Sequence, residues 1–270
     1  MSTDIPTVKE LFKAGAHFGH LRSKTDARTH SFVYTFKNKI AVIDLDKTVK
    51  QLGEAIDFLN SQANGGALVL FSGTKIQAKD KIKEVADKLK MPYVNERWPG
   101  GLVTNFKVVS KSIKKMVSIE KDLADDKYEH LTKNEKSKME KNLEKSKMIF
   151  DGLRDLDRIP DIVFVVDAKE EEIAILEART KNIPVIALCD TNANPKIVDY
   201  PIIVNDDSKK TIAMILDVIA ENFSKSYKPR VSGQDIGERV EKALEKKPKV
   251  ADKAEKKKGS LKDDGKNKKS

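Results

Sequence analysis

The sequence predicts an α/β fold in which a parallel, Rossmann-like sheet is sandwiched by helices. Three observations support this prediction. Short apolar runs, expected to be strands buried on both faces, alternate with stretches that have helical periodicity. The alternation stops once, between Asn105 and Leu153, where no strand pattern occurs. Glycine and proline separate many of these segments and indicate turns between them.

The first 104 residues contain three expected strands and three expected helices. Thr7 and Glu10 have the spacing of a capping box, which predicts a short helix that ends at Ala14. Apolar residues three or four positions apart give the next helix one apolar face. After the first helix we expect a strand at 39–45, a helix at 46–60, a strand at 67–71, a helix at 75–90 and a strand at 91–94.

The segment 105–150 differs from its surroundings because both of its apolar stripes have helical spacing. Thr132 and Glu135 again have capping-box spacing and indicate the start of a second helix. The sequence therefore predicts an antiparallel helical hairpin, similar to a coiled coil, inserted into the α/β domain. The stripes consist of Phe106, Val109, Ile113, Met116, Ile119 and Leu123, followed by Met139, Leu143, Phe150 and Leu153.

The α/β pattern returns after residue 150. We expect strands at 161–167, 183–190 and 200–204, with helices at 170–181 and 208–223. The rest of the chain is rich in Lys and poor in aromatic residues, which is typical of disorder. The predicted domains are an α/β sandwich at 1–104 and 151–227, a hairpin insertion at 105–150 and a disordered lysine-rich tail at 228–270.

The charge distribution indicates a polyanionic partner on one side of the protein. The 270 residues carry a net charge of +10. Basic residues exceed acidic ones in 1–150 and 228–270, whereas acidic residues dominate 151–227. General solubility explains the charge about as well. No apolar run is long enough to span a membrane, and the N-terminus lacks a secretory pattern, so we expect a cytoplasmic protein without a membrane partner.

No stretch of the sequence has the pattern of a catalytic or nucleotide-binding site. "FSGTK" at 71–75 lies between an expected strand and helix, but its glycine spacing does not match a Walker loop. Three aspartates, Asp167, Asp190 and Asp206, follow expected strands, yet spacing fixes no His or Lys partner for them. Polar loop caps explain them better than catalysis. We therefore expect no enzyme, no small-molecule substrate and no required cofactor.

The stretch "HFGH" at 17–20 is the best candidate for metal binding. His17 and His20 could share one divalent ion with Asp190 and Asp206 from the expected strand ends. Without an ion, the same histidines would form hydrogen bonds in a polar turn, and this alternative stays open.

Several motifs together resemble a known family, the bacterial form of small-ribosomal-subunit protein two. They include "LFKAGAHFGH", "ANGGALVLFSGTKIQA", "MPYVNERWPGGLVTNF" and "IPVIALCDTNANPKIVDYPIIVND", in the family's order from residue 8 to about 225. The resemblance implies a structural ribosomal protein located between head and body of the small subunit. It also implies contacts with 16S ribosomal RNA and with neighbouring ribosomal proteins, including the large mRNA-binding protein one.

The stretch "NERWPGGLVTNFK" marks the expected passage from the sheet to the hairpin. Gly100 and Gly101 permit a close backbone turn that a side chain would block. Thr104 or Asn105 can then cap the first hairpin helix.

Basic residues supply the expected contacts to RNA phosphates. Arg97 can pair with a phosphate, and Trp98 can stack on RNA, although packing at the base of the hairpin explains Trp98 equally well. After "HFGH" the sequence lacks the Trp that the family usually has, but it keeps the basic character. The candidate RNA-binding residues are Arg22, Lys24, Arg28, Lys37, Lys39, Lys75, Arg97, Trp98, Lys107, Lys111, Lys114 and Lys115.

Two other functions stay open from the sequence. One is a cytosolic α/β enzyme that binds a nucleotide or phosphorylated substrate near Gly73–Lys75. The other is an RNA-binding regulator that acts off the ribosome. The missing phosphate fingerprint and the basic hairpin argue against the enzyme.

Overall fold

The computed structural model describes residues 5–125 and 132–228, and its centre is a five-stranded parallel sheet. The strand order is β5–β4–β6–β7–β8, and each neighbouring pair is parallel. This arrangement confirms the predicted parallel α/β fold. The strands are β4 (Val69–Ser72), β5 (Tyr93–Val94), β6 (Ile162–Val166), β7 (Val185–Cys189) and β8 (Tyr200–Ile203).

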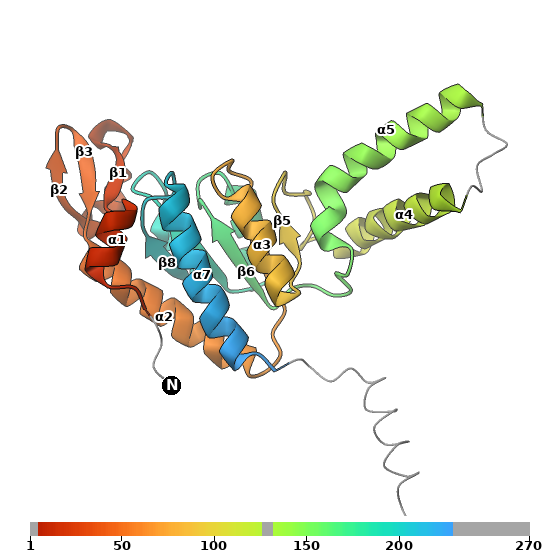
Figure 1. Ribbon diagram of the computed structural model, residues 1–270. Coiled ribbons are helices and arrows are strands. Elements are labelled where there is room, and N and C mark those ends of the chain that lie inside the picture. The colour runs from red at the N-terminus through yellow and green to blue at the C-terminus, as the bar shows by residue number, and fades with distance from the viewer. Residues whose placement is uncertain (1–4, 126–131, 229–270) are drawn as a thin grey trace, which may run out of the picture. The chain divides into compact units, whose positions relative to one another are not determined.

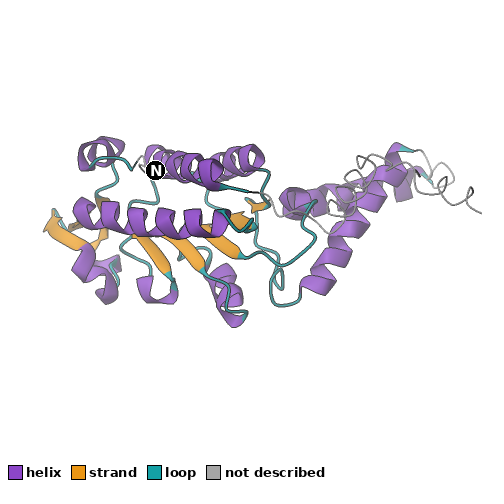
Figure 2. Ribbon diagram, turned by 90° about the horizontal axis from the view of Figure 1, so that it is seen from below, coloured by secondary structure: helices purple, strands orange, loops and turns teal. Residues whose placement is uncertain are grey.

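Helices cover both faces of the sheet, as Figure 2 shows with helices on either side of the strands. One face packs against α1 (Val8–Ala14), α2 (Leu45–Ala63), α3 (Lys79–Leu89) and α7 (Lys209–Ser226), and the other against α6 (Glu172–Thr180). Each face of the sheet has its own apolar core, and alternate residues of β6 belong to different cores. Phe164 belongs to the first core, on the face covered by α2, α3 and α7, and Val163 and Val165 belong to the second core, on the face covered by α6. Both faces are apolar, which explains the continuous hydrophobic runs in the sequence.

A second, smaller sheet lies before α2 in the chain. It contains β1 (Phe18–Leu21), β2 (Val33–Lys37) and β3 (Ile40–Ile43), in the order β1–β3–β2, and both pairs are antiparallel. The strand expected at 39–45 exists as β3, but its assignment to the parallel sheet is wrong. Asn38 and Lys39 have φ angles of 50° and 68° and form a two-residue hairpin turn.

The expected segment 105–150 contains two helices, α4 (Phe106–Ala124) and α5 (Lys133–Phe150), labelled in Figure 1. The predicted capping box at Thr132 and Glu135 is present. Glu120 of α4 forms ion pairs with Lys147 of α5 and with Arg154. The connection between the helices and the tail expected at 228–270 lie outside the described residues, except Lys228. Short 3-10 helices occur at Arg22–Lys24, Ala27–Phe32, Asp151–Leu153 and Pro195–Ile197.

No helix in the described part of the chain combines the length and the apolarity needed to cross a membrane. Cys189 is a free, buried thiol in β7, as its apolar surroundings in the sequence indicate.

The chain after α5 packs closely against β5, and this contact gives a stability prediction. A Cβ atom on Gly152 would clash with the carbonyl oxygen and the ring of Tyr93. Gly152→Ala is therefore expected to lower the free energy of unfolding by about 1–3 kcal/mol, measured by urea denaturation. Gly100→Ala is the matched control, because a Cβ atom there meets nothing within 4 Å. Equal stability of the two variants would contradict the prediction.

Candidate nucleic-acid interface

A single carboxylate organises the corner between the sheet and α4. Glu177 of α6 accepts hydrogen bonds from the backbone amides of Gly101 at 2.6 Å, Val103 at 3.1 Å and Thr104 at 3.2 Å. It also accepts from Nε1 of Trp98 at 3.2 Å and from the Thr104 hydroxyl at 3.1 Å. Burial raises the pKa of Glu177, but these donors outweigh burial and lower it overall. Glu177 thus fixes the whole turn that precedes α4.

The geometry of this corner corrects three expectations from the sequence. Trp98 is only 8% exposed and packs in the second core, so its ring is not available to stack on RNA. Asn105 is the N-cap of α4, but its side chain makes no capping hydrogen bond, and Thr104 binds Glu177 instead. Gly101 has φ of 84°, which agrees with the predicted need for glycine at that position. The expectation that a side chain would block the turn is wrong at Gly100, because a Cβ atom there would meet nothing within 4 Å.

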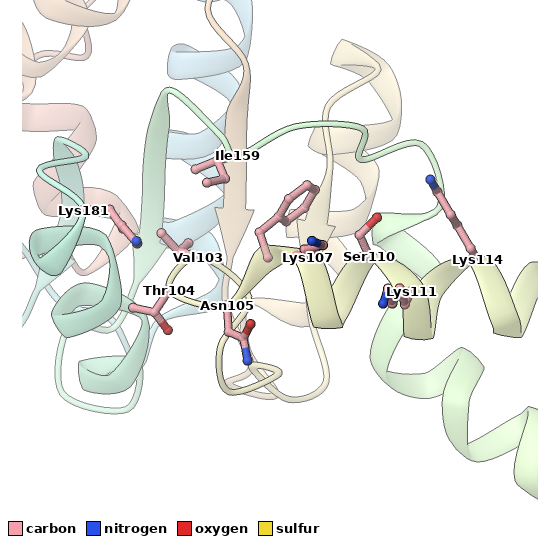
Figure 3. Close-up of a pocket in the computed structure, with 10 residues that line it drawn as sticks. Val103, Thr104, Asn105, Lys107, Ser110, Lys111, Lys114, Ile159 and Lys181 are labelled. Carbon is pink, nitrogen blue, oxygen red and sulfur yellow. The ribbon is translucent and has the colours of Figure 1, made fainter.

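A basic pocket of about 540 Å³ lies at the start of α4, and Figure 3 shows the side chains around it. Four lysines line it: Lys107, Lys111 and Lys114 from α4, and Lys181 from the end of α6. None of the described residues that line the pocket is Asp or Glu. The positive end of the α4 dipole adds to their field. The pocket can therefore hold an anion such as a phosphate group.

The expected basic residues of the small sheet are exposed, but they are not equally free. Arg28 is held by both carboxylate oxygens of Asp26, with two contacts of 2.9 Å. The Arg22 guanidinium lies 5.0 Å above the centre of the Phe36 ring. The candidate residues that form this basic patch, all of them exposed, are Arg22, Lys24, Arg28, Lys37 and Lys39. Two other candidates, Arg97 and Lys115, are also exposed but lie outside both the patch and the pocket lining.

Lys75 is not positioned for RNA contact, contrary to the expectation from the sequence. Its ammonium group lies 3.0 Å from Asp167 and 2.6 Å from both Asp206 and Asp207. Burial lowers the pKa of Lys75, but the carboxylates outweigh burial and raise it overall. Lys75 therefore neutralises an acidic cluster within the protein rather than a phosphate outside it.

The place where an α/β enzyme would bind a phosphate is filled by the protein itself. The sheet order changes direction at β4 and β6, and ligands of open α/β sheets bind beyond the strand ends at such a point. There, Glu171 accepts hydrogen bonds from the Ser72 hydroxyl at 2.8 Å and from the Thr74 amide at 2.9 Å. The amide that could bind a phosphate is already occupied by a buried carboxylate.

The predicted metal residues do not all come together. His20 lies near Asp190 and Asp207, but the ring of His17 stacks on Phe12 and contacts Phe18 at a tilt. Asp206, the fourth expected ligand, is bound to Lys75. The cluster therefore consists of His20, Asp190 and Asp207. Of the predicted ligands, His17 and Asp206 are not members, and Asp207 is present instead of Asp206.

Three important residues were missed by reasoning from the sequence. Glu177 lies within α6 between Leu176 and Ala178, and nothing in the pattern links it to a loop over 70 residues away. Lys181 enters the pocket from the turn after α6, which is a contact that only tertiary structure reveals. The "NDD" sequence contains Asp207, so its proximity to the strand end was a usable signal.

Comparisons with known proteins agree with the resemblance seen in the sequence. The family model described as Ribosomal protein S2 matches residues 11–226. Small ribosomal subunit protein uS2 of Cytophaga hutchinsonii is 42% identical over 247 residues, which are 92% of this chain and 96% of that protein. The protein of the same name from Coprothermobacter proteolyticus is 42% identical over 217 residues, which are 80% of this chain and 81% of that protein.

A third relative extends the comparison. Small ribosomal subunit protein uS2 of Oenococcus oeni is 39% identical over 234 residues, which are 87% of this chain and 90% of that protein. Since the family model covers most of the sequence and the relatives match over most of their own length, the chain belongs to the ribosomal protein S2 family.

Proposed function

We infer that the chain is a non-enzymatic, structural constituent of the small ribosomal subunit that binds ribosomal RNA and other ribosomal proteins. The observation that carries this inference is the family match across residues 11–226. The filled phosphate position beside Thr74 supports it, because it removes the feature that favoured a nucleotide-dependent enzyme.

The basic pocket at the start of α4 supports RNA as the ligand of this surface. RNA phosphates are bound largely by electrostatic attraction, so lysines without nearby acidic groups are suitable partners. Lys107, Lys111 and Lys114 are one helical turn apart on α4 and therefore face the same side. Their spacing suits a backbone segment that runs along the helix, with Lys181 contacting it from the sheet domain.

Finer features of the proposal follow from the family resemblance. The RNA is 16S ribosomal RNA, the position is between head and body of the subunit in the cytoplasm, and protein one is among the neighbours. We also propose that α4 and α5 form a coiled-coil-like hairpin inserted at 105–150 into the sandwich of 1–104 and 151–227. The lysine-rich tail at 228–270 then contributes positive charge.

Replacing the pocket lysines tests the RNA-binding surface directly. The triple variant Lys107→Gln, Lys111→Gln and Lys114→Gln is expected to incorporate less into small subunits, because up to three phosphate contacts are lost. In direct binding to RNA, the slope of log affinity against log salt should fall by roughly 0.7–0.9 per lost contact. Sucrose-gradient cosedimentation with subunits depleted of this protein measures the incorporation.

A matched control removes three positive charges from the opposite face of the sheet. Lys50 on α2, Lys88 on α3 and Lys210 on α7 are exposed, and their replacement by Gln should leave incorporation close to wild type. Equal losses in both triple variants would show that only net charge matters. Absence of the wild-type protein from subunit fractions would contradict the ribosomal role and favour a regulator acting elsewhere.

Glu177 gives a prediction about the corner that presents the pocket. Glu177→Gln replaces one acceptor oxygen by an NH2 group that opposes the loop donors, so it should destabilise the protein by about 1–3 kcal/mol. The folded-state pKa of Glu177 lies below its ordinary value, so its contribution to stability is fully present above that ordinary value and is lost as pH falls through the folded pKa. Glu172→Gln, exposed on the same helix, is the control. A difference in stability that stays constant to acid pH would contradict the ionic role.

The basic patch on the small sheet gives a separate prediction. The triple variant with Lys24→Ala, Lys37→Ala and Lys39→Ala should incorporate less into small subunits, since these three side chains are exposed. Its incorporation should also depend less on salt concentration. Arg28→Ala alone should have a smaller effect because Asp26 already holds its guanidinium. Competition between wild-type and variant protein for depleted subunits measures both. Incorporation of the triple variant at the wild-type level would exclude the patch from the RNA-binding surface.

A further inference from the structure

One cluster of titratable side chains is not used by the proposed RNA-binding surfaces. His20 of β1, Asp190 after β7 and Asp207 after β8 each present a donor atom, and these atoms lie within 4.8 Å of one another. Nδ1 of His20 is 3.1 Å from Oδ2 of Asp190, and Nε2 of His20 is 3.7 Å from Oδ2 of Asp207. Three segments that are distant in the sequence therefore meet at one edge of the sheet.

The backbone is shaped to hold His20 against this edge. The His20 amide donates a hydrogen bond to Oγ1 of Thr191 at 2.9 Å, and that hydroxyl donates to Oδ1 of Asp190 at 3.0 Å. A Cβ atom on Gly19 would lie 2.8 Å from Cγ2 of Thr191, so a side chain there would push β1 away. The glycine of "HFGH" thus permits the approach of its second histidine to Asp190.

The carboxylates at this edge of the sheet carry more negative charge than Lys75 neutralises. Asp167, Asp190 and Asp206 are at most 3% exposed, and Lys75 supplies one ammonium group to this group of carboxylates and Asp207. Buried charges without a partner are strongly unfavourable.

Two atoms of this region also lack a hydrogen-bond partner within the described residues. Oδ2 of the fully buried Asp206 has none, and Oδ1 of the same carboxylate contacts Lys75, which Asp207 also contacts. Nδ1 of His20 has no hydrogen bond of normal geometry, although a carboxylate oxygen lies 3.1 Å away. The separation between Nδ1 of His20 and Oδ2 of Asp190 is one that a single bound cation can bridge.

We propose that His20, Asp190 and Asp207 bind a divalent transition-metal ion of the zinc class. Nitrogen and oxygen ligands about 2.0–2.2 Å from a tetrahedral ion lie about 3.3 Å apart, close to the 3.1 Å between His20 and Asp190. Imidazole favours zinc over Mg²⁺ and Ca²⁺, which prefer oxygen ligands alone. One ring nitrogen of His20 binds the ion, and Asp207 supplies Oδ2 to it while Oδ1 of the same carboxylate contacts Lys75 at 2.6 Å. The ion joins β1 to the ends of β7 and β8.

The test uses the full-length chain without a histidine tag, freed of metal with a chelator. Titration calorimetry with Zn²⁺ is expected to show one saturable site per chain, whereas Mg²⁺ over the same range shows none. Bound Co²⁺ should give the visible absorption of a site with nitrogen and oxygen ligands. Zn²⁺ should also raise the melting temperature of the wild-type protein, because it binds the folded state.

Two variants and one control make the result specific. His20→Gln and Asp207→Asn should each weaken Zn²⁺ affinity at least tenfold; Asp207 is 55% exposed, so its replacement leaves the core intact. His30→Gln removes an exposed histidine outside the cluster and should retain wild-type affinity. Circular dichroism confirms that each variant is folded. No saturable Zn²⁺ binding, or wild-type affinity in both cluster variants, would overturn the proposal. The test is made on the isolated chain, so it is independent of the ribosomal role.

Discussion

The Glu177 carboxylate is the interaction on which the corner at the start of α4 depends. It accepts hydrogen bonds from three backbone amides of the turn at 101–104 and from the indole of Trp98, and thereby joins α6 to the start of α4. Amides that converge in a turn form a concave site for an anion. In this protein the anion is an internal side chain. The start of α4 is consequently fixed to the sheet domain before any partner binds.

The same principle applies at the centre of the parallel sheet. The Thr74 amide stands where an α/β enzyme would present backbone donors to a phosphate, and Glu171 occupies it. Lys75, which could have completed such a site, is held by aspartates that follow other strands. Both backbone anion sites are thus filled by the protein's own glutamates, and the attraction for external phosphates is left to exposed lysines. That division suits a protein that binds RNA by charge and shape rather than one that binds a nucleotide.

The sequence predicted the parallel sheet well because its strands are buried on both faces and read as uninterrupted apolar runs. It failed for β1 and β2, because their partly exposed residues show no clear alternation and the turn between β2 and β3 uses Asn38 and Lys39 without a glycine. The corner at 95–107 was recognised as special, but the partner that explains it, Glu177, is remote in sequence. The sequence therefore predicted which lysines of α4 carry the charge of the candidate site. It could not predict how the start of α4 is fixed to the sheet domain, because that depends on contacts between distant segments.

The two faces of α4 show why its lysine pattern is informative. Val109, Ile113 and Met116 are buried on one side, at the same helical spacing as Lys107, Lys111 and Lys114 on the other. Like charges one turn apart destabilise a helix by about 0.2–0.5 kcal/mol per pair, whereas burying each apolar side chain contributes roughly 1.5–3 kcal/mol. The apolar face therefore sets the stability of the helix, and the repulsion among the lysines is a small cost that it offsets easily. That repulsion is relieved when an anion lies along the lysine face, because the same charges then act on a phosphate instead of on one another. Since Glu177 already fixes the start of the helix, little of that binding energy is spent on ordering the backbone.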